Sequence, residues 1–179
     1  MLDPIAGPYL FDTSAESWLA RAEPGPARAW LLSYLSKHPI HVSAATVVER
    51  SRGYALLWRK VAPERRAGIE VSRTAYLGAL GRVWPIDITI AVIAGEIMAL
   101  LPDPPAARRR SHLAAESRQE RLVRWRFDCL IAATALSANL PLVHNNPVDF
   151  EAIRSATERD PHRFPGLGPL HLYRCQNLV

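Results

Sequence analysis

The sequence predicts an α/β fold in which a mostly parallel central sheet of about five strands carries helices on both faces. Short apolar runs with strand character alternate with longer segments whose apolar residues recur at helical spacing. Such alternation predicts parallel strands, because each intervening helix carries the chain back across the sheet. With 179 residues, 49% of them hydrophobic, the chain is long enough for a real core, and we expect one domain over residues 1–179.

The individual elements follow from apolar runs and from the proline and glycine residues that interrupt them. The first strand is expected to end at Asp12, where Thr13 and Glu16 have the spacing of a capping box that would start a helix. Further strands are expected at residues 40–43, 83–86 and 140–143 and within 164–173, and further helices after Pro26, from Ala44, from Pro63 to about Gly81, from Ile88 to Leu101, from Phe127 to Ala138 and after Pro147.

Residues 102–126 form a basic segment that we interpret as an insertion, either a solvated helix or a loop that becomes ordered on binding. The chain has a formal charge of +5, which favours a polyanionic partner such as a nucleic acid or an acidic protein. A solvated surface is the other explanation for such a charge run. The candidate contact residues are Arg52, Arg108, Arg109, Arg110 and Arg124.

The composition argues against several other classes of protein. Cys129 and Cys175 are the only cysteines and lie in apolar surroundings, so neither a disulfide framework nor a thiolate metal site is indicated. The most apolar segment, residues 88–101, carries Glu96 and has the length of a core helix, so no contact with a membrane is expected. Residues 1–7 lack the pattern of a signal peptide, and we expect a cytoplasmic protein.

Several acidic or amide side chains are expected at one edge of the sheet. Asp12 follows the first strand, Glu49 lies in the first turns after the second, and Asp128 opens the helix that precedes the fourth. Asn146 and Asp149 follow the fourth strand. Parallel strands bring these positions to their common carboxyl edge. Oxygen ligands without histidine or cysteine suit Mg²⁺ or Mn²⁺, which can activate water and stabilise charge on a phosphate.

Each of these residues also has a purely structural explanation. An aspartate at a strand–helix junction is often a helix cap, although Thr13 would already cap the helix after Asp12. Asp128 in a first helical turn would be favoured by the helix dipole alone. Asn146 precedes a proline, so capping and metal binding both remain open, and Asp149 could cap or salt-link its short helix.

Four segments together carry a resemblance to the PIN-domain family, in the order in which that family has them. They match its Asp-Thr-Asn/Ser motif, its helical Glu followed by Arg-Gly, its Asp-x-x-Ile-Ala-Ala motif and its strand-Thr-x-Asn/Asp-x-x-Asp-Phe segment. The segments are Leu10-Phe11-Asp12-Thr13-Ser14, Thr46 to Gly53, Asp128 to Ala135 and Leu142 to Phe150, and Phe164-Pro165-Gly166-Leu167 is also similar. The most similar subgroup is the VapC-type toxins of bacterial toxin–antitoxin pairs.

The resemblance implies a three-layer PIN sandwich and a Mg²⁺- or Mn²⁺-dependent endoribonuclease. It also implies a cognate antitoxin that holds the enzyme inactive, and often a homodimer. Carried over residue by residue, the family's catalytic and metal-binding acids fall on Asp12, Glu49 and Asp128, and the fourth metal-binding position falls on Asn146. Ser14 and Asp149 would support them.

The chain departs from the family pattern at His144, where a threonine is usual, and in the long segment 102–126. These departures keep open an alternative, a catalytically weak PIN-fold module that binds RNA or protein. A receiver-like phosphotransfer domain would also have acids at strand ends. It would need a lysine after a late strand, however, and the only lysines are Lys37 and Lys60. The sequence specifies neither the RNA target nor the number of metal ions.

Overall fold

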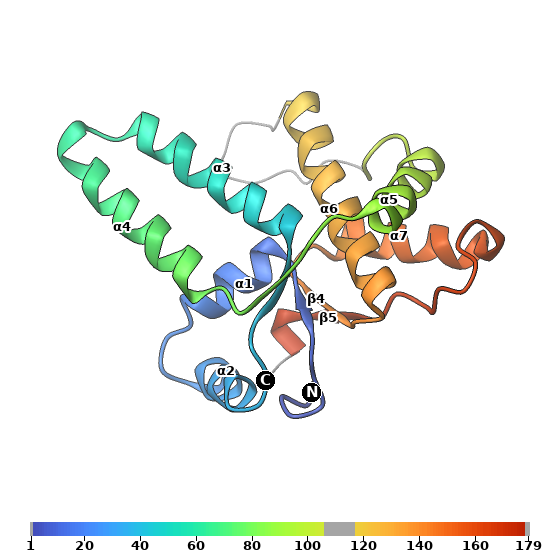
Figure 1. Cartoon of the computed structure of the whole chain (residues 1–179), viewed down its shortest axis with the longest axis horizontal. Coiled ribbons are helices and arrows are strands. Elements are labelled where there is room, and N and C mark those ends of the chain that lie inside the picture. Colours follow the sequence, from blue (N-terminus) through green and yellow to red (C-terminus); the bar gives the residue numbers. More distant parts are fainter. Residues whose placement is uncertain (1, 106–116, 178–179) are drawn as a thin grey trace.

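The structure is a computed structural model that describes residues 2–105 and 117–177. Within these residues it contains five strands, seven α-helices and two short 3-10 helices (Figure 1). The strands are β1 (Leu10–Phe11), β2 (His41–Ser43), β3 (Arg82–Trp84), β4 (Leu142–His144) and β5 (Leu172–Arg174). The helices are α1 (Thr13–Ala20), α2 (Pro26–Leu35), α3 (Ala44–Lys60), α4 (Pro63–Ala79), α5 (Ile88–Leu100), α6 (Arg118–Ala138), α7 (Pro147–Arg159), η1 (Pro161–Arg163) and η2 (Cys175–Asn177).

All the strands pair in parallel, in the order β3-β2-β1-β4-β5. The chain therefore starts at the central strand, moves outward to β3, and then returns to the other side of β1 to continue through β4 to β5. The carboxyl ends of β1 and β4 are joined by the backbone amide of Asp12, which donates to the carbonyl of Val143 over 3.0 Å. This confirms the predicted parallel α/β sheet and makes the β1–β4 junction its topological switch point.

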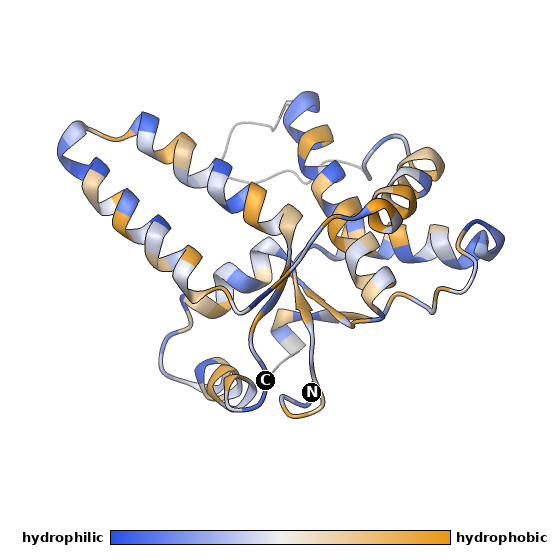
Figure 2. Ribbon diagram, in the orientation of Figure 1, coloured by the Kyte–Doolittle hydropathy of each residue, from blue (hydrophilic) through white to orange (hydrophobic). Residues whose placement is uncertain are grey.

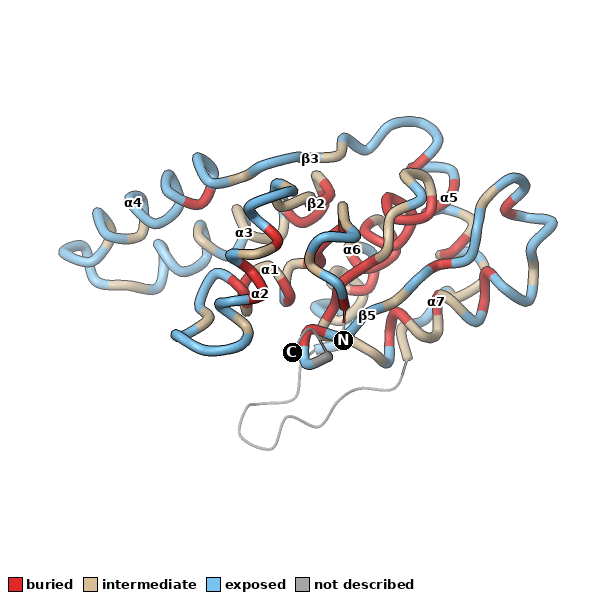
Figure 3. The backbone as a smooth tube through the Cα atoms, turned by 90° about the horizontal axis from the view of Figure 1, so that it is seen from below, coloured by how far each residue is buried: buried red, intermediate tan, exposed pale blue. Residues whose placement is uncertain are grey.

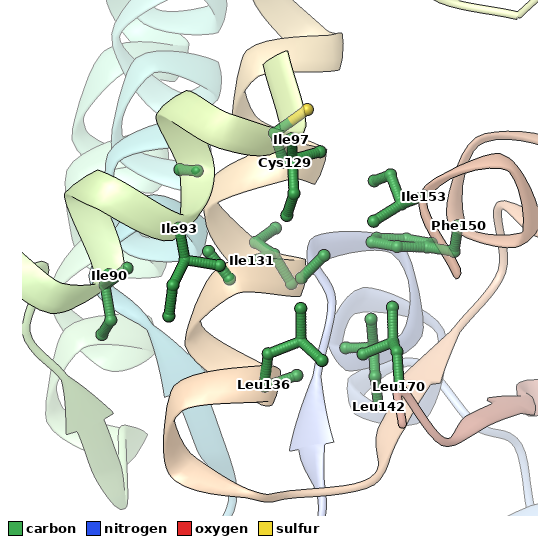
Figure 4. Packing of buried hydrophobic residues seen from close by; sticks show 14 of the residues in the cluster. Ile90, Ile93, Ile97, Cys129, Ile131, Leu136, Leu142, Phe150, Ile153 and Leu170 are labelled. Carbon is green, nitrogen blue, oxygen red and sulfur yellow. The ribbon is translucent and has the colours of Figure 1, made fainter. Parts of the chain in front are cut away.

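Successive residues of β1 and β4 point to opposite faces of the sheet, as a strand requires. Leu10 and Leu142 belong to a core cluster that α5, α6 and α7 complete, whereas Phe11 and Val143 belong to a second cluster under α1 and α2. Figure 4 shows the first cluster, and Figure 2 shows that α5 and the second half of α6 are the most apolar helices around it. The sheet is thus covered on both faces, as the sequence predicts.

Helix α6 begins earlier than the sequence analysis expects. Ser117 and Glu120 form a capping box in which the serine hydroxyl accepts from the Glu120 amide over 3.2 Å and Glu120 accepts from the Ser117 amide over 3.0 Å. Because this signal was not recognised, the prediction that Asp128 opens the helix is wrong, and Asp128 lies well inside it. Residues 118–126 of the basic segment are helical, whereas Arg108, Arg109 and Arg110 lie outside the described residues.

Helices α3 and α4 form a long hairpin that projects from the rest of the molecule (Figure 1). Most of the hairpin is exposed, as Figure 3 shows, and its buried residues are Ala45 and Thr46 at the start of α3 and Tyr76 near the end of α4. The hairpin is therefore attached to the body through its base. Across the described residues, no helix combines the length and the apolar character that a membrane span needs.

Two acidic residues fix the position of α5. Asp87 is the N-cap of α5 and accepts a hydrogen bond from the amide of Ile90 over 2.9 Å. Glu96 has a partner that the sequence did not indicate, because Arg163 donates to its carboxylate over 2.8 Å. This contact ties α5 to the turn that follows α7.

Candidate functional site

Asp12 lies immediately after the central strand and is buried, with 3% of its surface exposed. Its carboxylate accepts hydrogen bonds from the Ala15 amide over 2.6 Å and from the Ser14 hydroxyl over 2.8 and 3.0 Å. Asp12 is therefore the N-cap of α1, and the prediction that Thr13 caps this helix is wrong. The contact with Ser14 is the one that the sequence analysis expects.

Thr13 instead connects α1 to α3. Its hydroxyl donates to a carboxylate oxygen of Glu49, which lies half-buried on the second turn of α3. Helix α3 starts where it does because the Ser43 side chain accepts from the Ala45 amide over 3.2 Å. Glu49 thus reaches the end of β1 from the helix that follows β2, which places it beside Asp12.

Asp128, Asn146 and Asp149 form a second group on α6 and α7. The side-chain amide of Asn146 donates to Asp128 over 3.0 Å and also to Asp149. Asn146 occupies the N-cap position of α7, but its side chain makes no capping hydrogen bond there. Asp149 is buried in the first turn of α7. The amide group of Asn146 therefore bridges two carboxylates that would otherwise repel each other.

The pKa values of the buried carboxyls show that the two groups form one acidic cluster. Burial raises the pKa of Asp12 to about 6, with a smaller contribution from Glu49, while the hydrogen bonds from Ala15 and Ser14 lower it. Burial and then the charges of Asp149, Asp12 and Glu49 raise the pKa of Asp128 well above its usual range. These carboxylates are close enough for their charges to repel one another, so a bound cation would stabilise the cluster.

His144 is the last residue of β4. The sequence analysis expected it to come directly after the strand. It is 1% exposed and lies against the ring of Phe150, with 5.0 Å between the ring centroids. Burial, together with the nearby charge of Arg174, lowers the pKa of His144 to about 4. The imidazole is therefore neutral at physiological pH and adds no charge next to the acidic cluster.

Two of the candidate arginines lie within the described residues. Arg124 lies one turn before Asp128 on α6, and its charge lowers the pKa of that carboxyl. Arg52 is exposed on α3, three residues after Glu49. Both positions are near the cluster and can approach an anion that comes to it.

The donor set of the cluster consists of carboxylate and amide oxygens, which is the chemistry that Mg²⁺ or Mn²⁺ prefers. Among the described residues, no three His, Cys, Asp or Glu side chains stand ready in a common metal-binding arrangement. Oxygens of Glu49 and Asp128 are instead engaged by hydrogen bonds from Thr13 and Asn146. A divalent cation would have to draw these carboxylates together in exchange for those hydrogen bonds. The chemistry of the residues fits such an ion.

Comparison with known families decides which fold this is. The model of the PIN domain matches residues 9–155, a span that contains every acid of the cluster. The chain belongs to the PIN-domain family. The resemblance identified from four segments of the sequence is thereby confirmed. A comparison with curated protein sequences finds no match.

Solved structures with the same PIN fold include several protein complexes from bacteria. The chain is similar to one in VapBC2 from Rickettsia felis bound to a fragment of its promoter DNA, with 16% identity, a TM-score of 0.56 and coverage of 93% of this chain and 97% of that one. It is also similar to one in FitAcB from Neisseria gonorrhoeae, with 21% identity, a TM-score of 0.58 and coverage of 94% and 99%. It is similar as well to one in DNA-bound VapBC from Salmonella typhimurium, with 21% identity, a TM-score of 0.54 and coverage of 93% of this chain and 97% of that one. These neighbours share their fold with this chain.

Sequence reasoning missed one contact of this PIN site. It assigned Thr13 to helix capping, and so it did not anticipate the hydrogen bond to Glu49. The available signal was that Asp12 alone can cap α1, since its carboxylate reaches the amide three residues later. The hydroxyl of Thr13 would then have needed a different acceptor.

Proposed function

We propose that this protein is the toxin component of a toxin–antitoxin pair and that it acts as a Mg²⁺- or Mn²⁺-dependent endoribonuclease. The observation that carries the proposal is the cluster of buried and half-buried carboxylates at the switch point of a PIN fold. Burial and mutual repulsion raise the pKa of Asp12 and of Asp128. Such an arrangement costs stability in the absence of a cation, and shifted pKa values of this kind cluster at functional sites.

Asp12, Glu49 and Asp128 would hold the divalent cation, with Asn146 assisting directly or through water. When bound, such an ion supplies a nucleophile from water at neutral pH and neutralises charge that develops on the phosphate. The remaining contributions come from the chain itself. Ser14 and the Ala15 amide fix the orientation of Asp12, and Thr13 fixes that of Glu49.

Arginines beside the cluster support RNA as the substrate. Arg124 and Arg52 could contact phosphates of an RNA bound at the cluster, since Arg binds phosphate oxygens in a bidentate manner. Arg108, Arg109 and Arg110 remain candidate contacts to RNA or to the antitoxin on the basis of the sequence. Neutralising several phosphates would make RNA binding strongly dependent on salt.

The proposed antitoxin and a second copy of the chain would need surfaces on which to dock. Apolar side chains are exposed on the hairpin, for example Leu57 at 45% and Val71 at 69%, and on α5, where Ile88 is 82% and Val92 is 60% exposed. Figure 2 shows apolar and hydrophilic positions alternating along the hairpin. Exposed apolar side chains become typical of a protein interface where they form a contiguous patch.

Substitution of Asp12 by asparagine tests the proposed function. Asn can still cap α1, so Asp12→Asn should keep the fold while it abolishes Mg²⁺- or Mn²⁺-dependent cleavage of RNA and growth inhibition in cells. Asp103→Asn is the matched control, because within the described residues the contact of Asp103 is an exposed ion pair with Arg118 over 3.4 Å. This control should cleave RNA like the wild type.

The same assay distinguishes the alternative function. A wild-type protein that binds RNA but cleaves none in Mg²⁺ or Mn²⁺ would be a PIN-fold binding module. Cleavage that survives both a chelator and Asp12→Asn would contradict the proposed chemistry outright. Circular dichroism of each variant excludes unfolding as the cause of any loss.

A further inference from the structure

We infer that Arg50 is a positioning residue for Glu49 and that it links the α3–α4 hairpin to the acidic cluster. The inference rests on the proposed function, because it assigns Glu49 a role in holding the cation. Arg50 directly follows Glu49 on α3, but it does not contact Thr13, the partner of Glu49. Its contacts reach α1 on one side and α4 on the other.

On the α1 side, the guanidinium of Arg50 lies 3.4 Å from the carboxylate of Glu16. Both side chains are largely removed from solvent, with 26% of Arg50 and 12% of Glu16 exposed. Burial raises the pKa of Glu16, and the charge of Arg50 lowers it. Arg21 and a hydrogen bond from Ser17 also lower the pKa of Glu16, but Arg50 has the largest of the lowering effects. Separating Arg50 from Glu16 would therefore leave a buried charge with less compensation.

On the α4 side, the same guanidinium faces two aromatic rings. It lies 5.4 Å from the centroid of Tyr54, one turn further along α3, and 4.9 Å from that of Tyr76 on α4. The two rings are 6.0 Å apart. Tyr76 is the buried residue of α4, so this cation–π contact lies at the point where α4 meets the body.

The contact between Arg50 and Glu16 affects Glu49 because both Glu49 and Arg50, which are adjacent on α3, pair with residues of α1. Thr13 holds Glu49, and Glu16, one turn later on α1, holds Arg50. Two successive residues of α3 are thus fixed against one turn of α1, which sets both the rotation and the height of α3 at the cluster. Loss of the Arg50 pair leaves the single hydrogen bond from Thr13 to orient Glu49. A protein that binds the hairpin and shifts Tyr76 would reach the cluster by the same route.

Titration of the purified protein with Mn²⁺, followed by electron paramagnetic resonance without RNA, tests this role. Arg50→Met should bind Mn²⁺ about tenfold more weakly than the wild type, as expected when a residue that orients a metal ligand is lost. Removing a positive charge near carboxylates would by itself tighten cation binding, so a charge effect alone has the opposite sign. Arg73→Met is the matched control, since Arg73 lies on the same hairpin and, in the part of the chain that the structure describes, forms an exposed pair with Glu70.

Conservative variants make the test independent of folding. Arg50→Lys keeps the charge for Glu16 and the tyrosine rings and should recover most of the Mn²⁺ affinity. Tyr76→Phe keeps the ring and should match the wild type, whereas Tyr76→Leu should weaken Mn²⁺ binding. If Arg50→Met does not fold, the Tyr76 pair decides the question.

The outcomes separate this inference from the proposed function. Folded Arg50→Met and Tyr76→Leu proteins that bind Mn²⁺ as tightly as the wild type, or more tightly, would overturn the role of Arg50. The proposed function would stand in that case, provided that the wild type binds Mn²⁺ and cleaves RNA. A wild-type protein that neither binds Mn²⁺ nor cleaves RNA would contradict both the proposed function and the role of Arg50.

Discussion

The hydroxyl of Thr13 donates a hydrogen bond to the carboxylate of Glu49, a residue 36 positions later in the chain. The contact joins the helix after β1 to the helix after β2 at the carboxyl edge of the sheet. One hydroxyl thereby brings a carboxylate of α3 to the buried carboxylate of Asp12. The arrangement leads to a direct test.

Replacing Thr13 by valine keeps the shape of the side chain and removes the donor. We expect Thr13→Val to lower metal-dependent RNA cleavage by about tenfold to a hundredfold, because Glu49 loses its orientation. The free energy of unfolding should fall by only about 1 kcal/mol, the usual net value of one hydrogen bond. Cleavage kinetics and urea denaturation measure the two effects. Thr13→Ser retains the hydroxyl and should stay near wild type, and equal losses in both variants would contradict the role of the hydrogen bond.

Replacing Asp128 by asparagine should separate stability from activity. The substitution removes a buried charge that Asp149, Asp12 and Glu49 disfavour, and it retains an oxygen that can accept from Asn146. We expect the metal-free protein to become more stable by about 1 to 2 kcal/mol while cleavage is lost. Thermal melting in the presence of a chelator checks the first effect. A destabilised Asp128→Asn protein would show that the charge is already compensated without metal.

The pH dependence of stability should report the raised pKa of Asp12. Its pKa is 3.8 in a model compound and about 6 in the folded chain, so between these values the folded state holds more protons than the unfolded state. Stability from this group is therefore present at low pH and is lost as the pH rises through about 6, by about 3 kcal/mol in total. A saturating divalent cation should restore much of that loss at neutral pH.

His144 acts in the opposite direction, because its folded pKa of about 4 lies below 6.5 and its contribution is lost as the pH falls. The Asp12 effect must therefore be measured as a difference between wild type and Asp12→Asn, which share His144. Urea denaturation of the metal-free proteins at several pH values gives this difference. Parallel pH profiles for the two proteins would contradict the assignment.

Two glycines should respond in opposite ways to alanine. A Cβ at Gly81 would lie 2.5 Å from the Cβ of Pro39 and 2.9 Å from the carbonyl oxygen of Ile40, so β3 would have to move away from β2. Gly81→Ala should cost about 1 to 3 kcal/mol. At Gly95, within α5, a Cβ would meet nothing within 4 Å, and alanine should stabilise the helix by up to about 1 kcal/mol. Urea denaturation distinguishes the two, and similar effects at both positions would refute this explanation.

The sequence was sufficient for the order of strands and helices and for the acids that gather at one edge. Apolar runs such as the one before Asp12 are short and bounded by clear breaks, and a parallel sheet then leaves little choice of where their carboxyl ends meet. The family assignment rested on the same segments. The charges of Asp12 and Glu49 act on Asp128 in the structure, so the three acids lie at the same edge of the sheet. No three such side chains among the described residues form a metal-binding group, and their binding of a metal remains a prediction.

The sequence did not reveal details in which two side chains can make the same hydrogen bond or in which a contact joins different helices. Asp12 and Thr13 can both cap α1, and only the folded arrangement shows that Glu49 takes the hydroxyl of Thr13. The start of α6 was misplaced because the basic composition after residue 117 concealed a capping box. The contacts of Arg50 join three helices, and no periodicity within one helix indicates a contact to another.

The strand order has a consequence for the time at which the acidic cluster comes into being. Because β1 lies in the centre and β4 pairs beside it, the carboxylates come from segments as far apart as Asp12 and Asp149. A ribosome must release most of the chain before these groups can meet. An incomplete nascent chain thus carries Asp12 and Glu49 without the partners that α6 and α7 supply. The complete acidic cluster therefore arises only after synthesis has passed Asp149.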